Sequence, residues 1–154
     1  MSTMNIIFNK DEIKKVLPHR NPFLLVDKVL DFERNKYIKT TKLIKKNDLF
    51  LKGHFPKFPV LPGVYIMEIM AQSSCFLLLK SQKKILLKDF YCLSSIEKCN
   101  LKTFVFPEQR IFIKVFIKKK NLIKLKGIAK VNKKIVCLTY FSCMKINKDS
   151  VKKS

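Results

Sequence analysis

Two residues near the middle of the sequence are of types that could carry out acid–base chemistry, and a nearby glycine could help to bind a ligand. His54 is flanked by Gly53 and Pro56, which favour a tight and rigid turn, and a histidine can act as a base near neutral pH. Glu68 lies in an otherwise apolar segment, where burial would raise the pKa of its carboxyl group and suit it to act as an acid. Gly63 could bring a bare backbone N–H at a helix start close to a ligand oxygen.

Each of these residues also has a purely structural interpretation. A single histidine in a turn is often structural or only exposed, and a glutamate in an apolar helix often pairs with a lysine or reaches solvent. Gly63 could serve the turn alone. Gln72 lies on the same helical face as Glu68, so it could hold the carboxyl group in one orientation. The residue types alone leave both interpretations open.

A loop followed by a buried helix must position these residues. The segment 47–62 contains one glycine and three prolines, which predict a loop: Gly53, Pro56, Pro59 and Pro62. Residues 63–80 contain no proline and are apolar on almost every face, so they predict a buried helix with Pro62 at its first turn.

The remaining sequence predicts a short helix and several strands. Asn9 and Glu12 form a helix-start pattern, and the helix should end before Pro18. Two strands are predicted over residues 23–30 and 37–44. Five further β-branched or aromatic runs, several alternating with lysine, predict an antiparallel meander: residues 86–96, 101–106, 110–118, 122–131 and 135–146. We therefore expect an α+β fold in which a sheet of five to seven strands wraps one helix.

The length of 154 residues favours a single domain over residues 1–154, and residues from about 145 to 154 are expected to form a lysine-rich tail. No segment reaches the roughly 18 to 20 uncharged apolar residues that a membrane span needs, and the N-terminal residues lack a secretory-signal pattern. The five cysteines include no C-x-x-C pair, which favours free thiols in a reducing cytosol over a zinc site or disulfides. We expect a cytoplasmic protein without membrane insertion.

The net charge of +22 is the most unusual feature of the composition. Such a charge suggests a nucleic acid, an anionic membrane or an acidic protein as partner. However, only Arg20, Arg34 and Arg110 are arginines, and the abundant Lys, Ile, Phe and Asn all have AT-rich codons, so we attribute much of the charge to genome composition. The lysines are spread from Lys10 to Lys153 and nucleic-acid recognition motifs are missing, which argues against specific nucleic-acid binding. A basic nucleic-acid-binding domain without catalysis is kept as an alternative.

Three sequence blocks, in order, resemble a known family. They are LPHRNPFLLVD at residues 17–27, GHFPKFPVLPGV at residues 53–64 and EIMAQ at residues 68–72, and a weaker block, EKCNLKTFVFP, follows at residues 97–107. The chain closely resembles the FabZ-type 3-hydroxyacyl-[acyl-carrier-protein] dehydratases over residues 13–144. It departs from the usual family pattern in three places, which are Lys57-Phe58 in place of Gly-Lys, Ile69 in place of Ala, and Glu108-Gln109 in place of Gly-Asp.

The resemblance implies a hot-dog fold, in which a curled antiparallel sheet wraps a long central helix. It also implies homodimers, usually assembled as trimers of dimers, with His54 of one protomer and Glu68 of the other in each active site. The partner implied is an acyl carrier protein, which is highly acidic and would be attracted to a positive surface.

The implied reaction removes water from a (3R)-3-hydroxyacyl-[acyl-carrier-protein] to give the trans-2-enoyl product in fatty acid elongation, also supplying lipid A precursors. His54 would take the proton from C2 and Glu68 would assist departure of the C3 hydroxyl, while Gly63 would bind the thioester oxygen and Gln72 would orient Glu68. No metal or organic cofactor is required, because the thioester itself makes C2 acidic. A glutamate rather than an aspartate at position 68 favours the dehydratases that do not isomerise the double bond.

Another hot-dog enzyme is the main alternative. A thioesterase would use a carboxylate to activate a hydrolytic water, and the pairing of His54 with Glu68 argues against that chemistry. An assay that compares enoyl product with released thiol distinguishes the two activities.

Overall fold

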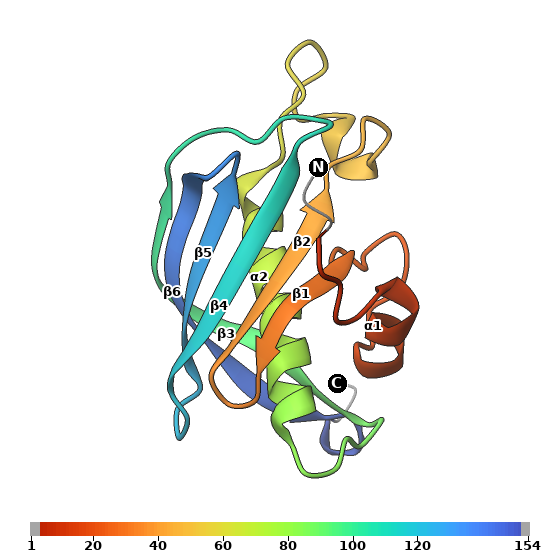
Figure 1. Cartoon of the computed structure of the whole chain (residues 1–154), viewed down its shortest axis with the longest axis vertical. Helices are drawn as coiled ribbons and strands as arrows, with labels where there is room; N and C mark the ends of the chain where they lie inside the picture. The colour runs from red at the N-terminus through yellow and green to blue at the C-terminus, as the bar shows by residue number, and fades with distance from the viewer. Residues whose placement is uncertain (1–3, 152–154) are drawn as a thin grey trace.

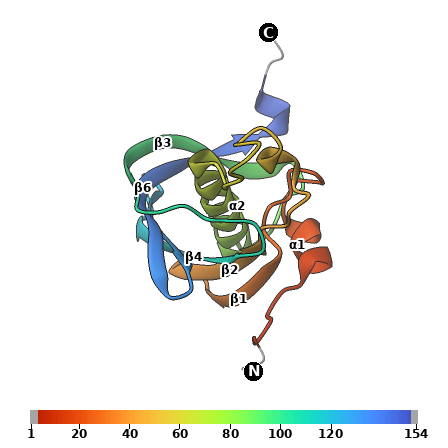
Figure 2. The same ribbon diagram turned by 90° about the horizontal axis from the view of Figure 1, so that it is seen from above.

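The computed structural model describes residues 4–151, and its centre is one long helix enclosed by a sheet. The helix, α2, spans Gly63–Ser81 and is surrounded on several sides by the curled sheet (Figures 1 and 2). The six strands are β1 (Lys28–Glu33), β2 (Tyr37–Leu43), β3 (Asp89–Leu101), β4 (Arg110–Lys119), β5 (Lys124–Val131) and β6 (Lys134–Asn147). All pairings are antiparallel, in the order β1-β2-β4-β5-β6-β3. The predicted α+β hot-dog fold is confirmed.

The apolar composition of α2 explains its central position. Side chains from nearly all its faces are buried, among them Ile66, Ile69, Met70, Phe76, Leu77 and Leu79. Burial of each such side chain contributes about 1.5–3 kcal/mol. Gly127 in β5 lets the sheet approach the helix closely, because a Cβ atom there would lie 2.5 Å from the Met70 sulfur. The sheet can therefore wrap tightly around the helix that carries Glu68.

The first helix, α1 (Lys10–Val16), forms as predicted. The Asn9 side chain accepts hydrogen bonds from the N–H groups of Asp11 and Glu12, both at 3.0 Å. Glu12 returns the interaction by accepting the Asn9 N–H at 2.7 Å, which completes a capping box. Ile13 anchors the helix to the core. The chain then leaves the helix before Pro18, as expected from the missing N–H of proline.

The predicted strand over residues 23–30 is wrong in its first half, since β1 begins only at Lys28. Leu24, Leu25 and Val26 are buried as expected, but they lie in an extended segment without a neighbouring strand. The Leu25 N–H is instead bonded to a side chain of α2, that of Gln72, at 2.9 Å. A polar helix side chain thus takes the place of a strand partner.

The second half of the chain also differs from the expected meander. The predicted strands over 86–96 and 101–106 are one strand, β3, followed by a loop, and β3 pairs with β6 rather than with β4. Phe104 and Phe106 lie in that loop and pack edge-to-face around Phe58. Most of the apolar run 101–106, for which the sequence predicts a strand, therefore lies in a loop and contributes two rings to an aromatic cluster. Only β4, β5 and β6 follow one another as a meander.

The lysine-rich tail expected from about residue 145 to 154 overlaps the end of the last strand. β6 continues to Asn147, and a short 3-10 helix follows at Lys148–Ser150. A second 3-10 helix, in the loop before α2, spans Leu49–Leu51. β3 and β6 remain paired as far as Asp89 and Asn147, and the Lys145 ammonium lies 2.7 Å from the buried carboxylate of Asp89. Residues 152–154 of the expected tail lie outside the described residues.

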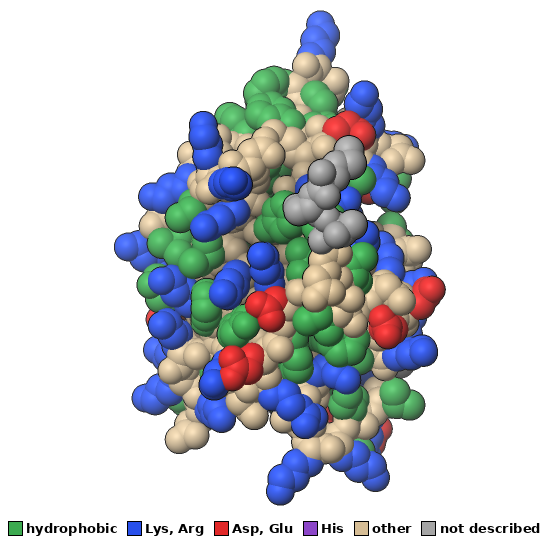
Figure 3. Space-filling view, viewed as in Figure 1, with side chains coloured by type: hydrophobic (Ala, Val, Ile, Leu, Met, Phe, Trp, Pro, Cys, Tyr) green, Lys and Arg blue, Asp and Glu red, His purple; other side chains and the backbone are tan. Residues whose placement is uncertain are grey.

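Lysine and arginine side chains are spread over the whole face seen in Figure 3 instead of gathering over one element. Among residues 4–151, no helix combines the length and the apolar character needed to cross a membrane.

Candidate active site

The loop before α2 holds the His54 ring in one orientation. His54 Nδ1 lies 3.0 Å from the carbonyl oxygen of Val60, and the Val60 N–H donates to the His54 carbonyl at 2.9 Å. A carbonyl oxygen only accepts hydrogen bonds, so Nδ1 carries the proton and Nε2 carries the lone pair. Nε2 forms no hydrogen bond within residues 4–151. The ring is therefore oriented as a base would be.

A cavity of about 590 Å³ opens beside His54. Most of its lining is apolar, and it includes Leu61, Ile66, Leu101 and Phe104 together with Gly63. The cavity lies where the loop meets the start of α2, at the upper end of the helix in Figure 1. Such a space could hold part of an apolar chain next to the imidazole ring.

Gly63 is the first residue of α2, and close packing explains why it is a glycine. Its backbone φ is not positive, so turn chemistry alone does not require glycine there. A Cβ atom on Gly63, however, would collide with the side chain of Leu101. The first N–H groups of a helix have no intrahelical acceptor, and the helix dipole adds positive potential at this end. A ligand oxygen can therefore approach this N–H.

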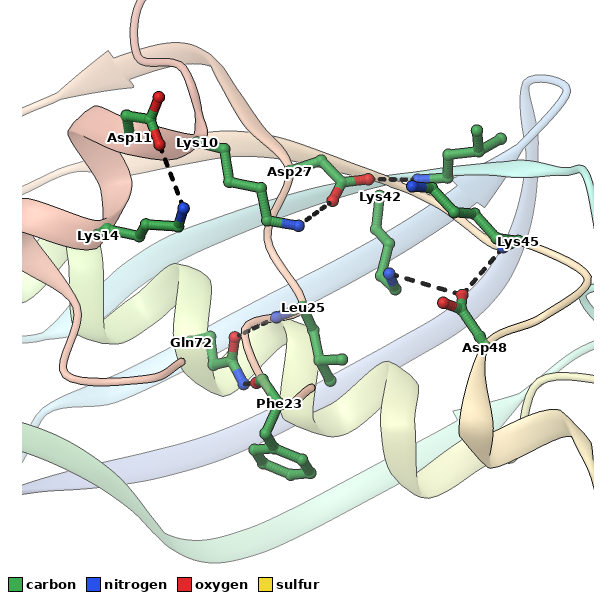
Figure 4. Close-up of polar contacts among 11 residues, drawn as sticks. Lys10, Asp11, Lys14, Phe23, Leu25, Asp27, Lys42, Lys45, Asp48 and Gln72 are labelled. Carbon is green, nitrogen blue, oxygen red and sulfur yellow. Dashed lines mark hydrogen bonds and ion pairs between the residues drawn. The ribbon is translucent and has the colours of Figure 1, made fainter. Parts of the chain in front are cut away.

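Glu68 is held by Gln72, as the sequence predicts. The Gln72 Nε2 donates to Glu68 Oε1 at 2.9 Å and to the Phe23 carbonyl at 2.8 Å, while its Oε1 accepts the Leu25 N–H. Figure 4 shows the Gln72 amide between Phe23 and Leu25. Burial raises the pKa of Glu68. The hydrogen bond from Gln72 lowers it, but by less than burial raises it. The neutral acid form is therefore favoured more than in water.

The segment that Gln72 binds is fixed at its other end by Asp27. The Asp27 carboxylate pairs with the Lys10 ammonium at 3.1 Å and accepts the Leu43 N–H at 2.8 Å (Figure 4). The extended residues 23–27 are therefore tied to α1, β2 and α2 together. This bracing keeps the Gln72 amide, and through it Glu68, in place.

His19 is a residue near Glu68 to which the sequence reasoning assigns no role. Its Nε2 lies 3.8 Å from Glu68 Oε1, and both side chains are largely buried. Burial, and secondarily the positive charge of Arg20, lower the pKa of His19. Two features of the sequence could have indicated a role for His19. It lies in the LPHRNPFLLVD block, and it is one of only two histidines in the chain.

Within one chain, the structure does not bring His54 and Glu68 together. Ile66 lines the cavity beside His54, and Glu68 follows two residues later, which is a rotation of about 200° around the helix axis. In the part of the chain that the structure describes, no hydrogen bond or ion pair joins His54 to Glu68. In one chain, His54 with its cavity and Glu68 therefore lie on different sides of α2.

A curled antiparallel sheet wrapped around one long helix is the hot-dog fold. The model of the FabA-like domain family matches residues 17–139. The 3-hydroxyacyl-[acyl-carrier-protein] dehydratase FabZ of Buchnera aphidicola subsp. Schizaphis graminum (strain Sg) is 45% identical over 139 residues, which cover 89% of this chain and 91% of that protein. The chain belongs to the FabZ-type dehydratase family and is a hydro-lyase.

Solved structures share the fold at low sequence identity. A chain of the dehydratase heterocomplex ApeI:P from Xenorhabdus doucetiae has a TM-score of 0.60 at 17% identity, over 73% of this chain and 91% of that chain. A hypothetical thioesterase with coenzyme A from Streptococcus pneumoniae TIGR4 has a TM-score of 0.57 at 13% identity, over 77% and 84%. The fold alone therefore does not choose between dehydratase and thioesterase, whereas the curated relatives favour the dehydratase.

Proposed function

We propose that this protein converts (3R)-3-hydroxyacyl-[acyl-carrier-protein] to trans-2-enoyl-[acyl-carrier-protein] in fatty acid elongation, and that its products also supply lipid A precursors. The observation that carries the proposal is the orientation of His54. Its Nδ1–H is bonded to the Val60 carbonyl, which leaves the Nε2 lone pair as a base beside the apolar cavity and the Gly63 N–H. The curated relatives at 39–45% identity carry the same activity in their names.

In the proposed reaction, His54 Nε2 takes the proton from C2 of the substrate. The electron pair of that C–H bond forms the C2=C3 double bond as the C3–O bond breaks. Glu68 donates its proton to the departing hydroxyl, which leaves as water, and the proton on His54 then returns to Glu68 through solvent. The Gly63 N–H binds the thioester oxygen, where negative charge develops, and a donor of this kind typically contributes about 10²- to 10³-fold in rate.

The active site is proposed to form between two copies of the chain, each giving one half-site. Support comes from the two faces of α2, because His54 and Glu68 of one chain lie on opposite sides of it. A homodimer would bring the base of one protomer to the acid of its partner, and three such dimers would make the expected hexamer.

Mixing two inactive variants tests this arrangement. His54→Ala and Glu68→Ala should each abolish turnover without loss of folding. In a co-refolded mixture, half of the dimers are mixed, and each mixed dimer has one intact site, so about a quarter of the sites should regain activity. No recovery, with mixed dimers demonstrated by mass spectrometry, would place both residues of each site in one chain.

The proposed partner is an acyl carrier protein in the cytoplasm. The net charge of +22 complements an acidic carrier, and five free cysteines fit a reducing compartment. The direct test is to incubate the purified protein with 3-hydroxyacyl-carrier proteins of several chain lengths and to measure enoyl product and released thiol separately. Enoyl formation without thiol release supports the proposal; thiol release alone would favour a thioesterase.

A further inference from the structure

Two side chains from different parts of the chain converge on one oxygen of Glu68. Gln72 Nε2, on α2, donates to Oε1 at 2.9 Å. His19 Nε2, from the turn that follows α1, lies 3.8 Å from the same oxygen. The second distance is longer than a hydrogen bond, but contacts of this kind often shorten when a site is filled. Oε1 thus accepts one N–H group, from Gln72, and has a second candidate donor, His19 Nε2, just beyond hydrogen-bond distance.

The other ring nitrogen of His19 decides which tautomer the ring adopts. Nδ1 is buried and has no hydrogen-bond partner within residues 4–151. A proton on Nδ1 would be a buried donor without an acceptor, whereas a proton on Nε2 faces the Glu68 carboxyl group. Burial and the charge of Arg20 also lower the pKa of His19, which keeps the ring neutral near pH 7. The Nε2–H tautomer is therefore favoured.

We propose that His19 is a positioning residue that, together with Gln72, occupies Glu68 Oε1 and so keeps the carboxyl proton on Oε2. An oxygen that accepts two N–H groups has little capacity left to bear a proton, so the acid proton is directed to the oxygen that is not held. This inference rests on the proposed function, because it concerns the proton that Glu68 is proposed to donate. The proposed role gives His19 a function even though its turn does not line the His54 cavity.

Other titratable groups near Glu68 do not supply the same contact. The thiols of Cys75, Cys92 and Cys143 lie close enough for a charge on Glu68 to affect them, but burial raises the pKa of all three, so they are neutral. The Arg20 guanidinium donates to the carbonyl oxygens of Leu17 and His19 and serves the turn itself. Among the described titratable groups, His19 is thus the one in direct reach of Oε1.

Nuclear magnetic resonance can test the tautomer directly, because the chain has only two histidines. In a full-length His54→Ala variant labelled with ¹⁵N-histidine, all imidazole signals come from His19. We expect the neutral Nε2–H form at pH 7, and a change of the Nε2 signal in a His54→Ala/Glu68→Gln double variant. A ring protonated on Nδ1, or a signal indifferent to position 68, would overturn the inference.

Kinetics test the consequence for the proposed acid. His19→Leu should lower kcat about 10- to 100-fold while KM changes less than about two-fold, because proton transfer rather than binding is impaired. Loss of a donor to the carboxylate should also move the Glu68 limb of the kcat–pH profile to higher pH. His19→Gln, which retains an N–H donor, should recover most of the rate. Arg20→Leu is the matched control, since it removes the hydrogen bonds of Arg20 in the same turn but retains the His19 imidazole.

The two proposals fail in different ways. If the wild-type protein turns over no 3-hydroxyacyl-carrier protein, the proposed function fails, and the resonance experiment alone decides the His19–Glu68 contact. If the wild-type protein is active but His19→Leu and Arg20→Leu lower kcat equally, with no shift of the pH limb and no rescue by His19→Gln, the turn is only structural. That outcome would overturn the positioning role while leaving the dehydratase intact.

Discussion

The side chain of Leu101, at the end of β3, lies directly against the α carbon of Gly63, the first residue of α2. An added Cβ would lie 3.3 Å from one Leu101 methyl group and still closer to the other. An added Cβ at position 63 would therefore require the exposed Leu101 side chain, which borders the His54 cavity, to move away from the residue whose N–H is proposed to bind the thioester oxygen.

Gly63→Ala should consequently displace either Leu101 or the helix start. We expect kcat to fall by about 10²-fold, within the range found when a positioned N–H donor is lost, and we expect stability to change less. Leu101→Ala removes the obstacle, so the Gly63→Ala/Leu101→Ala double variant should be more active than Gly63→Ala alone. A double-mutant cycle on kcat measures this coupling, and strict additivity would contradict the packing explanation.

Gln72 should matter for stability as well as for activity. Gln72→Ala leaves the buried Leu25 N–H and the Phe23 carbonyl without their partner, and each such loss costs about 1–3 kcal/mol. Urea unfolding should therefore give a free energy of unfolding lower by about 2–6 kcal/mol. Gln82→Ala is the control, because Gln82 donates one side-chain hydrogen bond, to the Tyr91 hydroxyl, in a half-buried position. Equal losses in the two variants would argue against the bracing role of Gln72.

The raised pKa of Glu68 predicts a specific pH dependence of stability. A carboxyl group whose pKa is higher in the folded state binds its proton more tightly there, so folding is disfavoured as pH rises from the unfolded pKa through the folded one. Glu68→Gln is always neutral and keeps the Oε1 acceptor for Gln72. The variant should therefore be more stable than the wild type at pH 8, and the difference should vanish below about pH 4.5. Thermal unfolding across this range measures it; a constant difference would contradict the raised pKa.

The turn between β5 and β6 offers a stabilising substitution. Asn132 and Lys133 form its two-residue loop, and both have positive φ angles, of 48° and 67°. Asn-Gly is the preferred pair for such a loop, so Lys133→Gly should raise the free energy of unfolding by up to about 1 kcal/mol without changing kcat. Lys134→Gly, in β6 itself, should lower stability instead. If both variants are destabilised alike, strain at position 133 is not significant.

Local signals in the sequence were sufficient for the elements that depend on neighbouring residues. The α1 capping box needs only Asn9 and Glu12, and α2 needs only a long apolar run after a proline-rich loop. The contact of Gln72 with Glu68 follows from the helical repeat. These features could be predicted because the interacting residues are close in the sequence.

Features that depend on distant segments could not be predicted in the same way. The pairing of β3 with β6, and the use of Gln72 as the partner for Leu25, join residues far apart in sequence. His19 lies near Glu68 only because the turn after α1 packs against α2. Glu108 adopts a positive φ of 66° where the family usually has glycine, and its N–H is bonded to the Ile44 carbonyl. No local pattern indicates that contact.

The partner of His54 Nδ1 is a main-chain carbonyl, that of Val60. Every amino acid at position 60 would supply the same oxygen, so the tautomer of the proposed base is insulated from side-chain change at its own contact. Side-chain changes on the surface and in this loop can thus leave the protonation of the proposed base undisturbed, because the contact uses a main-chain oxygen. The tautomer therefore depends on the backbone conformation between residues 54 and 60. What must be preserved in related sequences is the shape of this loop and not any single side chain in it.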